Sequence, residues 1–202
     1  MRVTAETKKA TRQKILDAAQ ALFRTTGYES TTTRDIARAA GIATGTLFNY
    51  FPTKEAIVTG LIVDSQSRSA HGSHSEPHES LEEALFAHTA AGLRVLKPYR
   101  KYLTPVLDTA LSPLAESNRN DVGQSLRTDH LETVVELARQ HKLEAALSPV
   151  ALQMYWTLYL GVLSFWTSDK SPKQEDTLAL LDQSLAMFVS WLRGGDERTT
   201  SN

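Results

Sequence analysis

The chain has 202 residues, of which 41% are hydrophobic and none is cysteine. This length supplies enough apolar side chains for one large domain or two smaller ones, and the lack of cysteine excludes disulfides and any cysteine-based metal or nucleophile site. The net charge of -1 hides an asymmetry, because residues 1–68 carry ten Lys/Arg against six Asp/Glu and the remainder carries twelve against seventeen. A basic end joined to an acidic end suggests that only the first part meets a polyanion.

The first predicted element is an amphipathic helix from Lys9 to Thr26. Apolar residues recur in it at helical spacing, and Gly27 ends it. Residues 1–8 are polar, and we expect them to be frayed. The N-terminal sequence contains no apolar core of a secretory signal, so the expected location is the cytoplasm. Its basic side chains either follow a phosphate backbone or only increase solubility, and both interpretations are open.

Residues 32–51, TTRDIARAAGIATGTLFNYF, describe two short helices joined by a tight turn. Thr32 with Asp35 is typical of a capping box at the start of the first helix. Gly41 supplies a residue that takes positive φ after that helix, and Thr44 is expected to cap the second. Another helix is predicted to start at residues 52–55 and to run to about residue 68.

The spacing of apolar and small residues in this segment resembles the DNA-binding helix-turn-helix. Residues 41–55, GIATGTLFNYFPTKE, resemble the TetR family of one-component bacterial transcription regulators. The resemblance covers residues 9–68, which we expect to form the DNA-binding domain. It implies a homodimer that binds a double-stranded, near-palindromic DNA operator, most often as a repressor, and that a small-molecule effector in a second domain releases.

Docking in the major groove would place the second helix of the motif against base edges, with Leu47 pointing inward to the first helix. Phe48 stands where the family more often has Tyr, so we expect it to contact a thymine methyl rather than a phosphate. Tyr50 either faces the DNA or packs inward with Phe51. The predicted DNA contacts are Thr33, Arg34, Thr44, Gly45, Thr46, Phe48, Asn49, Tyr50 and Lys54, with Lys54 on a phosphate.

The remaining sequence shows helical periods and no long β alternation, so the predicted fold class is all-α, with a larger helical ligand-binding and dimerisation domain after the DNA-binding domain. The polar segment 70–79 marks the boundary, and the second domain is expected at residues 79–194. Residues 148–168 carry no charge and are apolar on every face, which predicts a helix buried all round. A membrane span is the alternative, but Gln153, Thr157 and Ser164 interrupt it, and no membrane association is expected.

Apolar residues recur at alternating spacings of three and four in the last predicted helix, residues 173–193, which indicates a packing seam. One chain would not cover both this seam and the uncharged helix before it, so we predict a dimer interface through Leu178, Leu181, Leu185 and Phe188. The second domain is also rich in aromatic and polar-aromatic residues. These residues either line the effector pocket that the resemblance implies or fill the core; they are Phe86, His88, Tyr99, Tyr102, His130, Met154, Tyr155, Trp156 and Tyr159.

The spacing of His71, His74 and His78 suggests a metal site, but they lie in a Ser/Gly/Pro segment without identifiable carboxylate or cysteine partners, so neither a metal nor a cofactor is expected. The sequence contains no HExxH, GxSxG or phosphate-binding glycine loop, so no enzymatic activity is predicted. Two alternatives to a TetR-like regulator are kept. One is an architectural or nucleoid-associated DNA-binding protein without an effector, and the other is an α-helical enzyme.

Overall fold

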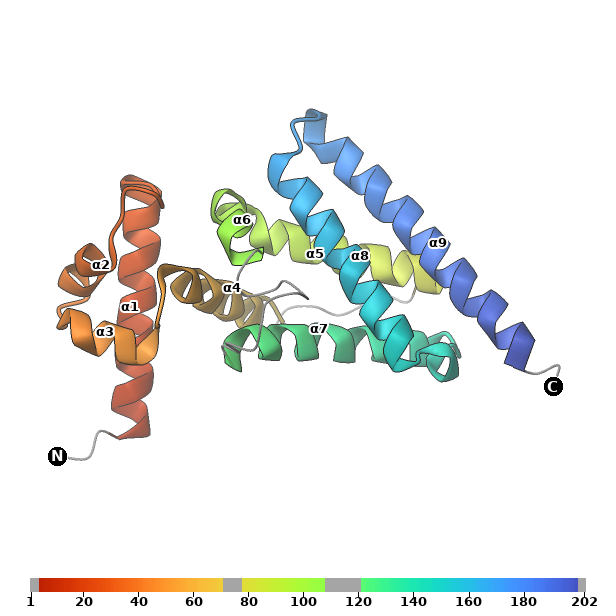
Figure 1. Cartoon of the computed structure of the whole chain (residues 1–202), viewed down its shortest axis with the longest axis horizontal. Coiled ribbons are helices and arrows are strands. Elements are labelled where there is room, and N and C mark those ends of the chain that lie inside the picture. The colour runs from red at the N-terminus through yellow and green to blue at the C-terminus, as the bar shows by residue number, and fades with distance from the viewer. Residues whose placement is uncertain (1–3, 71–77, 108–120, 200–202) are drawn as a thin grey trace.

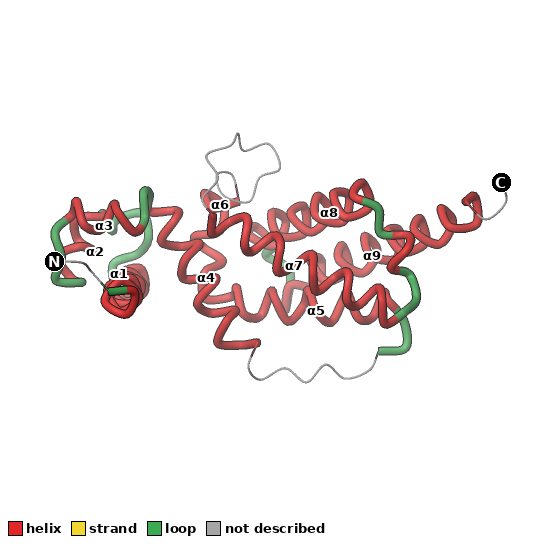
Figure 2. Tube along the Cα trace, turned by 90° about the horizontal axis from the view of Figure 1, so that it is seen from below, coloured by secondary structure: helices red, strands yellow, loops and turns green. Residues whose placement is uncertain are grey.

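The structure, a computed structural model, describes residues 4–70, 78–107 and 121–199. These residues form helices joined by turns, and none of them lies in a β-strand, so the predicted all-α class is confirmed. Figure 1 shows a small group of helices, α1–α3, at one end of the molecule and a larger bundle, α5–α9, at the other, with α4 running between them. The two ends of the chain lie at opposite ends of the molecule (Figure 2). We call α1–α3 the head and α5–α9 the body.

The head consists of three helices: α1 (Ala5–Thr25), α2 (Thr33–Ala39) and α3 (Thr44–Tyr50). The predicted capping box is confirmed, because the Asp35 amide donates to Thr32 Oγ1 (3.2 Å) and the Thr32 amide donates to Asp35 Oδ2 (3.1 Å). Gly41 has φ +69°, as the predicted turn requires. These local signals fix the angle at which α3 leaves α2.

Two local predictions in the head are wrong. Residues 5–8 are helical rather than frayed, because Thr4 Oγ1 accepts a hydrogen bond from the Thr7 amide (3.2 Å) and so caps α1. Thr44 is the first residue of α3 rather than its cap. The cap position belongs to Ala43, whose carbonyl accepts from the Leu47 amide (3.1 Å) and whose side chain makes no capping bond.

Helix α4 (Lys54–Ala70) passes α1 very closely at Gly60. A β-carbon at this position would lie 2.8 Å from Phe51 Cε1 and 3.1 Å from Leu16 Cδ2, and both of those side chains are buried. Only glycine fits such an approach without movement of its neighbours. The start of α4 is thereby packed into the head, while its later turns contact α5, α6 and α7.

The body consists of four long helices and several short ones. Helix α9 packs along α5 and α8, and α7 packs against α4 and α5. The predicted boundary segment 70–79 lies largely outside the described residues. The elements are α5 (Leu81–Leu96), η1 (Lys97–Tyr102), α6 (Leu103–Val106), α7 (Asp121–Gln140), η3 (Glu144–Ala146), α8 (Pro149–Ser168), η4 (Pro172–Gln174) and α9 (Glu175–Thr199).

Helix α8 is not buried all round in the subunit, contrary to the prediction. One face carries Tyr155 and Trp166, which are almost fully buried, whereas Val150 on the other face is 65% exposed and Phe165 is 41% exposed. Among the helices of the described residues, none combines the length and the apolar character that a membrane span needs. The open face of α8 lies beside an open face of α9.

The predicted dimer residues lie mainly inside their own subunit, although Phe188 also borders the open surface between α8 and α9. Leu181, Leu185 and Phe188 are only 2%, 4% and 2% exposed, and Leu178 is half-buried. They lie in the core of their own subunit because the seam that they form packs against α5 and α8. The apolar surface that α9 leaves open is on its other side, where Met187 is 72% exposed and Trp191 is 43% exposed.

Candidate nucleic-acid interface and interior pocket

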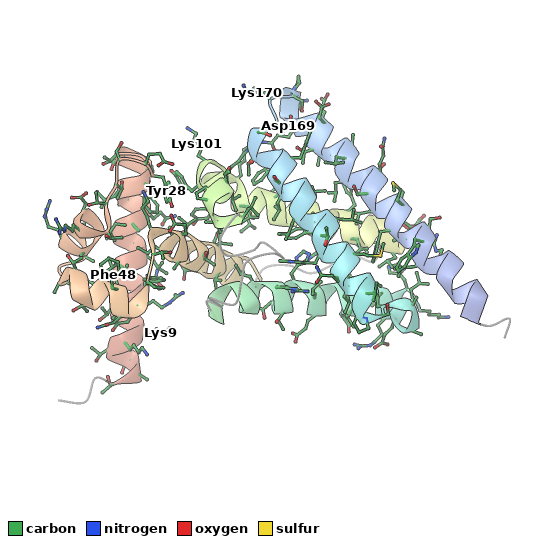
Figure 3. The ribbon with its side chains drawn as sticks, in the orientation of Figure 1. Lys9, Tyr28, Phe48, Lys101, Asp169 and Lys170 are labelled. Atoms are coloured by element: carbon green, nitrogen blue, oxygen red, sulfur yellow. The ribbon has the colours of Figure 1, made fainter. Side chains whose placement is uncertain are left out.

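The outer face of α3 presents polar and aromatic side chains to solvent. Leu47 is fully buried, as predicted, and the next residue, Phe48, is 46% exposed on the surface of the helix (Figure 3). Gly45 and Asn49 are exposed, and the other predicted contacts of this helix, Thr44, Thr46 and Tyr50, are half-buried. We call these six residues the α3 face. Tyr50 also packs against the head core, so both uses proposed for it fit its position.

The start of α2 adds the other two predicted contacts in the helix-turn-helix. Arg34 is exposed and Thr33 is half-buried, and both lie in the first turn of α2. The amide groups of a first turn and the dipole of the helix favour anions there. The structure therefore leaves the guanidinium of Arg34 accessible to a phosphate.

Lys54 has a structural role that the sequence did not suggest. Its ammonium donates to the carbonyl oxygens of Tyr28 (2.9 Å) and Thr31 (3.3 Å), and it lies 4.0 Å from the centroid of the Tyr28 ring. An ammonium has three N–H donors, so these bonds leave one for another acceptor. The predicted phosphate contact stays a prediction, and Lys54 first of all holds the α1–α2 turn against the start of α4.

Tyr28 also connects the α1–α2 turn to the start of α4. Its hydroxyl donates to Glu55 Oε1 (2.8 Å), and burial together with this bond raises the pKa of the phenol. The ring stacks on Tyr102 of η1, with centroids 5.5 Å apart, and Figure 3 shows Tyr28 on the side of the head that faces α6. Tyr28 thus joins the head, the start of α4 and the body.

Two residues predicted for the effector pocket lie instead between head and body. Tyr102 donates its hydroxyl hydrogen bond to the main-chain oxygen of Phe23 (3.1 Å), and Gln20 Nε2 donates to the hydroxyl of Tyr99 (3.3 Å). The pocket assignment of Tyr99 and Tyr102 is corrected, because η1 turns both side chains toward α1. Their sequence neighbourhood could not show this, since the contacts span 79 positions of the chain.

Arg100, which lies between those two tyrosines in the sequence, connects η1 to the end of α8 through hydrogen bonds. Its Nε donates to the main-chain oxygen of Trp166 (2.7 Å), its Nη2 donates to that of Asp169, and the guanidinium lies 5.4 Å from the centroid of the Trp166 ring. A cation bound to the last carbonyl groups of a helix is favourable for both. One short segment, near the labelled Lys101 and Asp169 in Figure 3, therefore contacts both the head and α8.

The other polar-aromatic predictions converge inside the body. His88 Nε2 and His130 Nδ1 are 3.3 Å apart, and His130 Nε2 lies 3.2 Å from the hydroxyl of Tyr155. The His130 ring also stacks on Tyr159, with centroids 4.2 Å apart. Burial and, to a smaller extent, the neighbouring His88 lower the pKa of His130 to about 3, and burial also lowers the pKa of His88, so both imidazoles are neutral at pH 7.

A small cavity lies beside the contacts between His88, His130 and Tyr155. Its wall contains His130, Trp156 and Tyr159, and aliphatic side chains from α4, α5, α6, α7 and α8 complete it. The free space is about 20 Å³, which is room for one water molecule. Trp156 belongs to the aromatic residues singled out in the sequence, and it lies three positions before Tyr159 on α8 and therefore on the same helical face.

Two further predicted pocket residues do not line the cavity. Phe86 is half-buried and packs against the core, and Met154 lies on the outer face of α8, where it is 39% exposed. The described residues contain no cluster of three or more His, Asp or Glu side chains that would hold a metal. His71 and His74 lie outside the described residues.

The buried His130 predicts a specific loss of stability in acid. Its pKa is lowered in the folded state, so below pH 6.5 the unfolded chain binds a proton that the folded chain does not, and the free energy of unfolding falls as pH drops. Between pH 7 and pH 5 this contribution reaches at most about 2 kcal/mol. Urea unfolding at the two pH values should show that His130→Gln reduces the difference by this amount. His141→Gln, outside the chain of contacts, is the control, and an unchanged pH dependence in His130→Gln would contradict the prediction.

Comparison with known proteins agrees with this architecture. A family model described as bacterial regulatory proteins, tetR family, matches residues 15–61, and a tetracyclin repressor-like C-terminal domain model matches residues 85–195. The uncharacterised HTH-type transcriptional regulator YvkB of Bacillus subtilis is 39% identical over 185 residues, which cover 89% of this chain and 95% of YvkB. The HTH-type transcriptional regulator UidR of Escherichia coli is 29% identical over 144 residues, which cover 67% of this chain and 66% of UidR.

Among solved structures, the TetR-family transcriptional repressor FadR of Thermus thermophilus, in complex with lauroyl-CoA, has the same fold. The TM-score is 0.63 at 22% identity, and the match covers 88% of this chain and 93% of FadR. The second family model alone matches more than half of the chain, and YvkB is similar over nearly its whole length. The chain therefore belongs to the TetR family of bacterial transcriptional regulators.

Proposed function

We propose that this protein is a one-component repressor that binds a near-palindromic operator as a homodimer and that a small molecule releases. The observation that carries the proposal is the α3 face, because Phe48 and Asn49 are exposed there while Leu47 packs the inner side of the helix into the core of the head. A helix held in this way can enter the major groove with its outer side chains against base edges. Membership of a family of transcription regulators supports the same use.

The two kinds of DNA contact fall on different parts of the head. Thr44, Thr46 and Asn49 carry hydroxyl and amide groups that discriminate between bases, and Phe48 offers an apolar surface to a thymine methyl. Arg34 and the remaining N–H of Lys54 bind phosphates and position the head. In a dimer, two such heads would reach half-sites about 34 Å apart, one turn of the double helix.

The dimer contact belongs on the open apolar faces of α8 and α9. These faces border a trough of about 680 Å³, in which Val150 and Met187 are the most exposed large apolar side chains. We call it the α8–α9 trough; it is lined by Pro149, Val150, Gln153, Met154, Thr157, Leu158, Met187, Phe188 and Trp191. An apolar surface of this kind on two adjacent helices fits a two-fold contact that a second copy completes.

Effector release follows from the position of the cavity. Its wall includes Ile62 of α4, and the first turn of α4 is bound to the head through Lys54 and Glu55. A ligand that widens the cavity would displace α4 and with it the head, so it would prefer an arrangement with wrongly spaced heads. Operator affinity would then fall by as much as the ligand prefers that arrangement.

Selection of bound sequences from a random DNA pool distinguishes a sequence-specific regulator from an architectural DNA-binding protein. Sequences that the protein enriches from the pool should bind at least about 10³-fold more tightly than the unselected pool at the same salt concentration. Equal affinity for selected and unselected DNA would contradict the proposal and favour a DNA-binding protein without an operator.

Substitutions in the head should separate base reading from phosphate binding. Asn49→Ala should cost about 1–3 kcal/mol on the selected operator and relax the preference at one base pair. Lys54→Ala should weaken all sequences alike and reduce the slope of log K against log salt by about 0.9, since one phosphate contact is lost. Because Lys54 also holds the α1–α2 turn, thermal unfolding of this variant is measured alongside. A change of base preference in Lys54→Ala, with none in Asn49→Ala, would mean that α3 docks differently.

A further inference from the structure

The head is attached to the body at two places. The first is α4, whose start packs into the head at Gly60 and whose later turns contact α5, α6 and α7. The second is the contact between the last turns of α1 and η1, where Tyr99 and Tyr102 meet the head. A head held through one helix can tilt about that helix, and a second attachment restrains the tilt. The η1 contact therefore restrains the orientation of the head on the body.

This second attachment combines packed rings with hydrogen bonds. The ring centroid of Tyr102 lies 5.5 Å from those of both Phe23 and Tyr28, and its hydroxyl donates to the main-chain oxygen of Phe23 (3.1 Å). Gln20 Nε2 adds a hydrogen bond to the hydroxyl of Tyr99 (3.3 Å). Phe23, Tyr28 and Tyr99 are buried. Close-packed rings that also carry directed hydrogen bonds favour one relative position of the two segments.

Arg100 connects the same short segment to the helices on its other side. Its guanidinium donates to the main-chain oxygens of Trp166 (2.7 Å) and Asp169 and lies beside the Trp166 ring. Both acceptors are themselves held in place, because the Trp166 indole N–H donates to Gln174 Oε1 (2.9 Å) and the Thr177 amide donates to Asp169 Oδ2 (3.1 Å). These residues join α8 to α9, the two helices of the proposed dimer contact. The position of η1 is thus fixed relative to the helices through which the two bodies would meet.

We propose that Tyr99, Arg100 and Tyr102, which we call the η1 clamp, determine the spacing between operator half-sites that the dimer accepts. The inference rests on the proposed homodimer and adds residues that select the operator without touching it. One added base pair moves a half-site by about 3.4 Å and turns it by about a tenth of a helical turn. Heads that the clamp holds rigidly cannot follow this change, whereas heads held by α4 alone can.

Operators with one base pair added to or removed from the segment between the half-sites test the proposal on the full-length protein. By fluorescence anisotropy at one salt concentration, the wild type should bind these altered operators at least about 30-fold more weakly than the selected one, because one half-site is then misplaced. Arg100→Gln and Tyr102→Phe should each reduce this loss at least about threefold, since they remove hydrogen bonds of the clamp.

Lys101→Gln is the matched control, because Lys101 is exposed, follows Arg100 directly and loses the same charge. Its loss of affinity on the altered operators should equal that of the wild type. Thermal unfolding and sedimentation check that each variant is a folded dimer. If Arg100→Gln does not fold, Tyr102→Phe decides alone, since it removes one hydroxyl and keeps the ring.

The wild-type measurement separates failure of the clamp from failure of the proposed function. A steep dependence on spacing in the wild type that the folded clamp variants retain unchanged would overturn the η1 clamp and leave the proposed dimer in place. Equal affinity of the wild type for every spacing would contradict operator binding by two heads and, with it, the clamp. A merely structural role of Arg100 would lower the unfolding midpoint without relaxing the dependence on spacing.

Discussion

A protein carrying Met187→Asp should sediment as a monomer of 22.3 kDa at micromolar concentration. Met187 is 72% exposed in the isolated subunit and lies in the α8–α9 trough. In the proposed dimer a two-fold axis would bring two new carboxylates into the same apolar contact. Burying each unpaired charge costs several kcal/mol, which is a large share of the stability of most dimers.

The same variant should lose operator binding although its head is unchanged. A monomer contacts one half-site, so it retains roughly half of the binding free energy, and an operator bound at 10⁻⁸ M or tighter would then be bound about 10⁴-fold more weakly. Thr128→Asp, on the exposed surface of α7, is the control and should remain a dimer with full affinity. A dimeric Met187→Asp protein would place the interface elsewhere.

A charge on the buried side of α9 should act differently. Leu185→Glu puts a carboxylate where the leucine is 4% exposed in its own subunit, so we expect loss of folding instead of a folded monomer. Circular dichroism during heating separates the two variants. Met187→Asp should keep its helical signal as a monomer, whereas Leu185→Glu should lose a cooperative transition.

The second large effect is expected at Gly60, where Gly60→Val should abolish operator binding and leave the dimer intact. The new β-carbon would lie 2.8 Å from Phe51 and 3.1 Å from Leu16, and these rigidly packed side chains cannot move away cheaply. Even one added methyl group in such a packed core costs about 1–3 kcal/mol, and valine adds two methyl groups beyond the β-carbon. We expect α4 to separate from α1 and the head to loosen.

Hydrogen exchange and sedimentation check this prediction together. Amides of α1 and α3 should exchange faster in Gly60→Val, while α8 and α9 keep their protection and the protein remains a dimer. Gly92→Ala on α5 is the matched control, since nothing lies within 4 Å of a β-carbon there. Unchanged exchange in the head would mean that α4 tolerates the valine and that the close approach is not required.

The head could be predicted from the sequence because its signals are local. The capping box of Thr32 and Asp35 and the positive φ of Gly41 each depend on a few neighbouring residues. Leu47 was identified as buried from the apolar spacing of the motif and from the way in which its second helix docks in the major groove. The missed feature, Lys54 bound to the carbonyl of Tyr28, joins residues 26 positions apart, and a lysine that binds a phosphate looks the same in a sequence as one that binds main-chain carbonyl groups.

The body was predicted less well because its contacts are distant in sequence. Helix α9 has apolar residues on two sides, and its spacing indicated one seam without showing whether its own subunit or a second copy covers it. The side with Leu185 is covered, and the side with Met187 is open. In the same way, His88 and Tyr102 looked equivalent as candidates, yet one turns toward His130 and the other toward Phe23.

The bond from Tyr102 to α1 has a consequence for how relatives of this protein diverge. Its acceptor is the main-chain oxygen of Phe23, so any α1 with the same backbone offers the same oxygen, whatever its side chains. The side chains that the head adds at this contact are the aromatic rings of Phe23 and Tyr28 and the amide of Gln20, which donates to Tyr99. Under the proposed function, a head with a different α3 face would therefore fit the same body as long as its α1 keeps this backbone and these three side chains, so that the operator could change without a change in the effector.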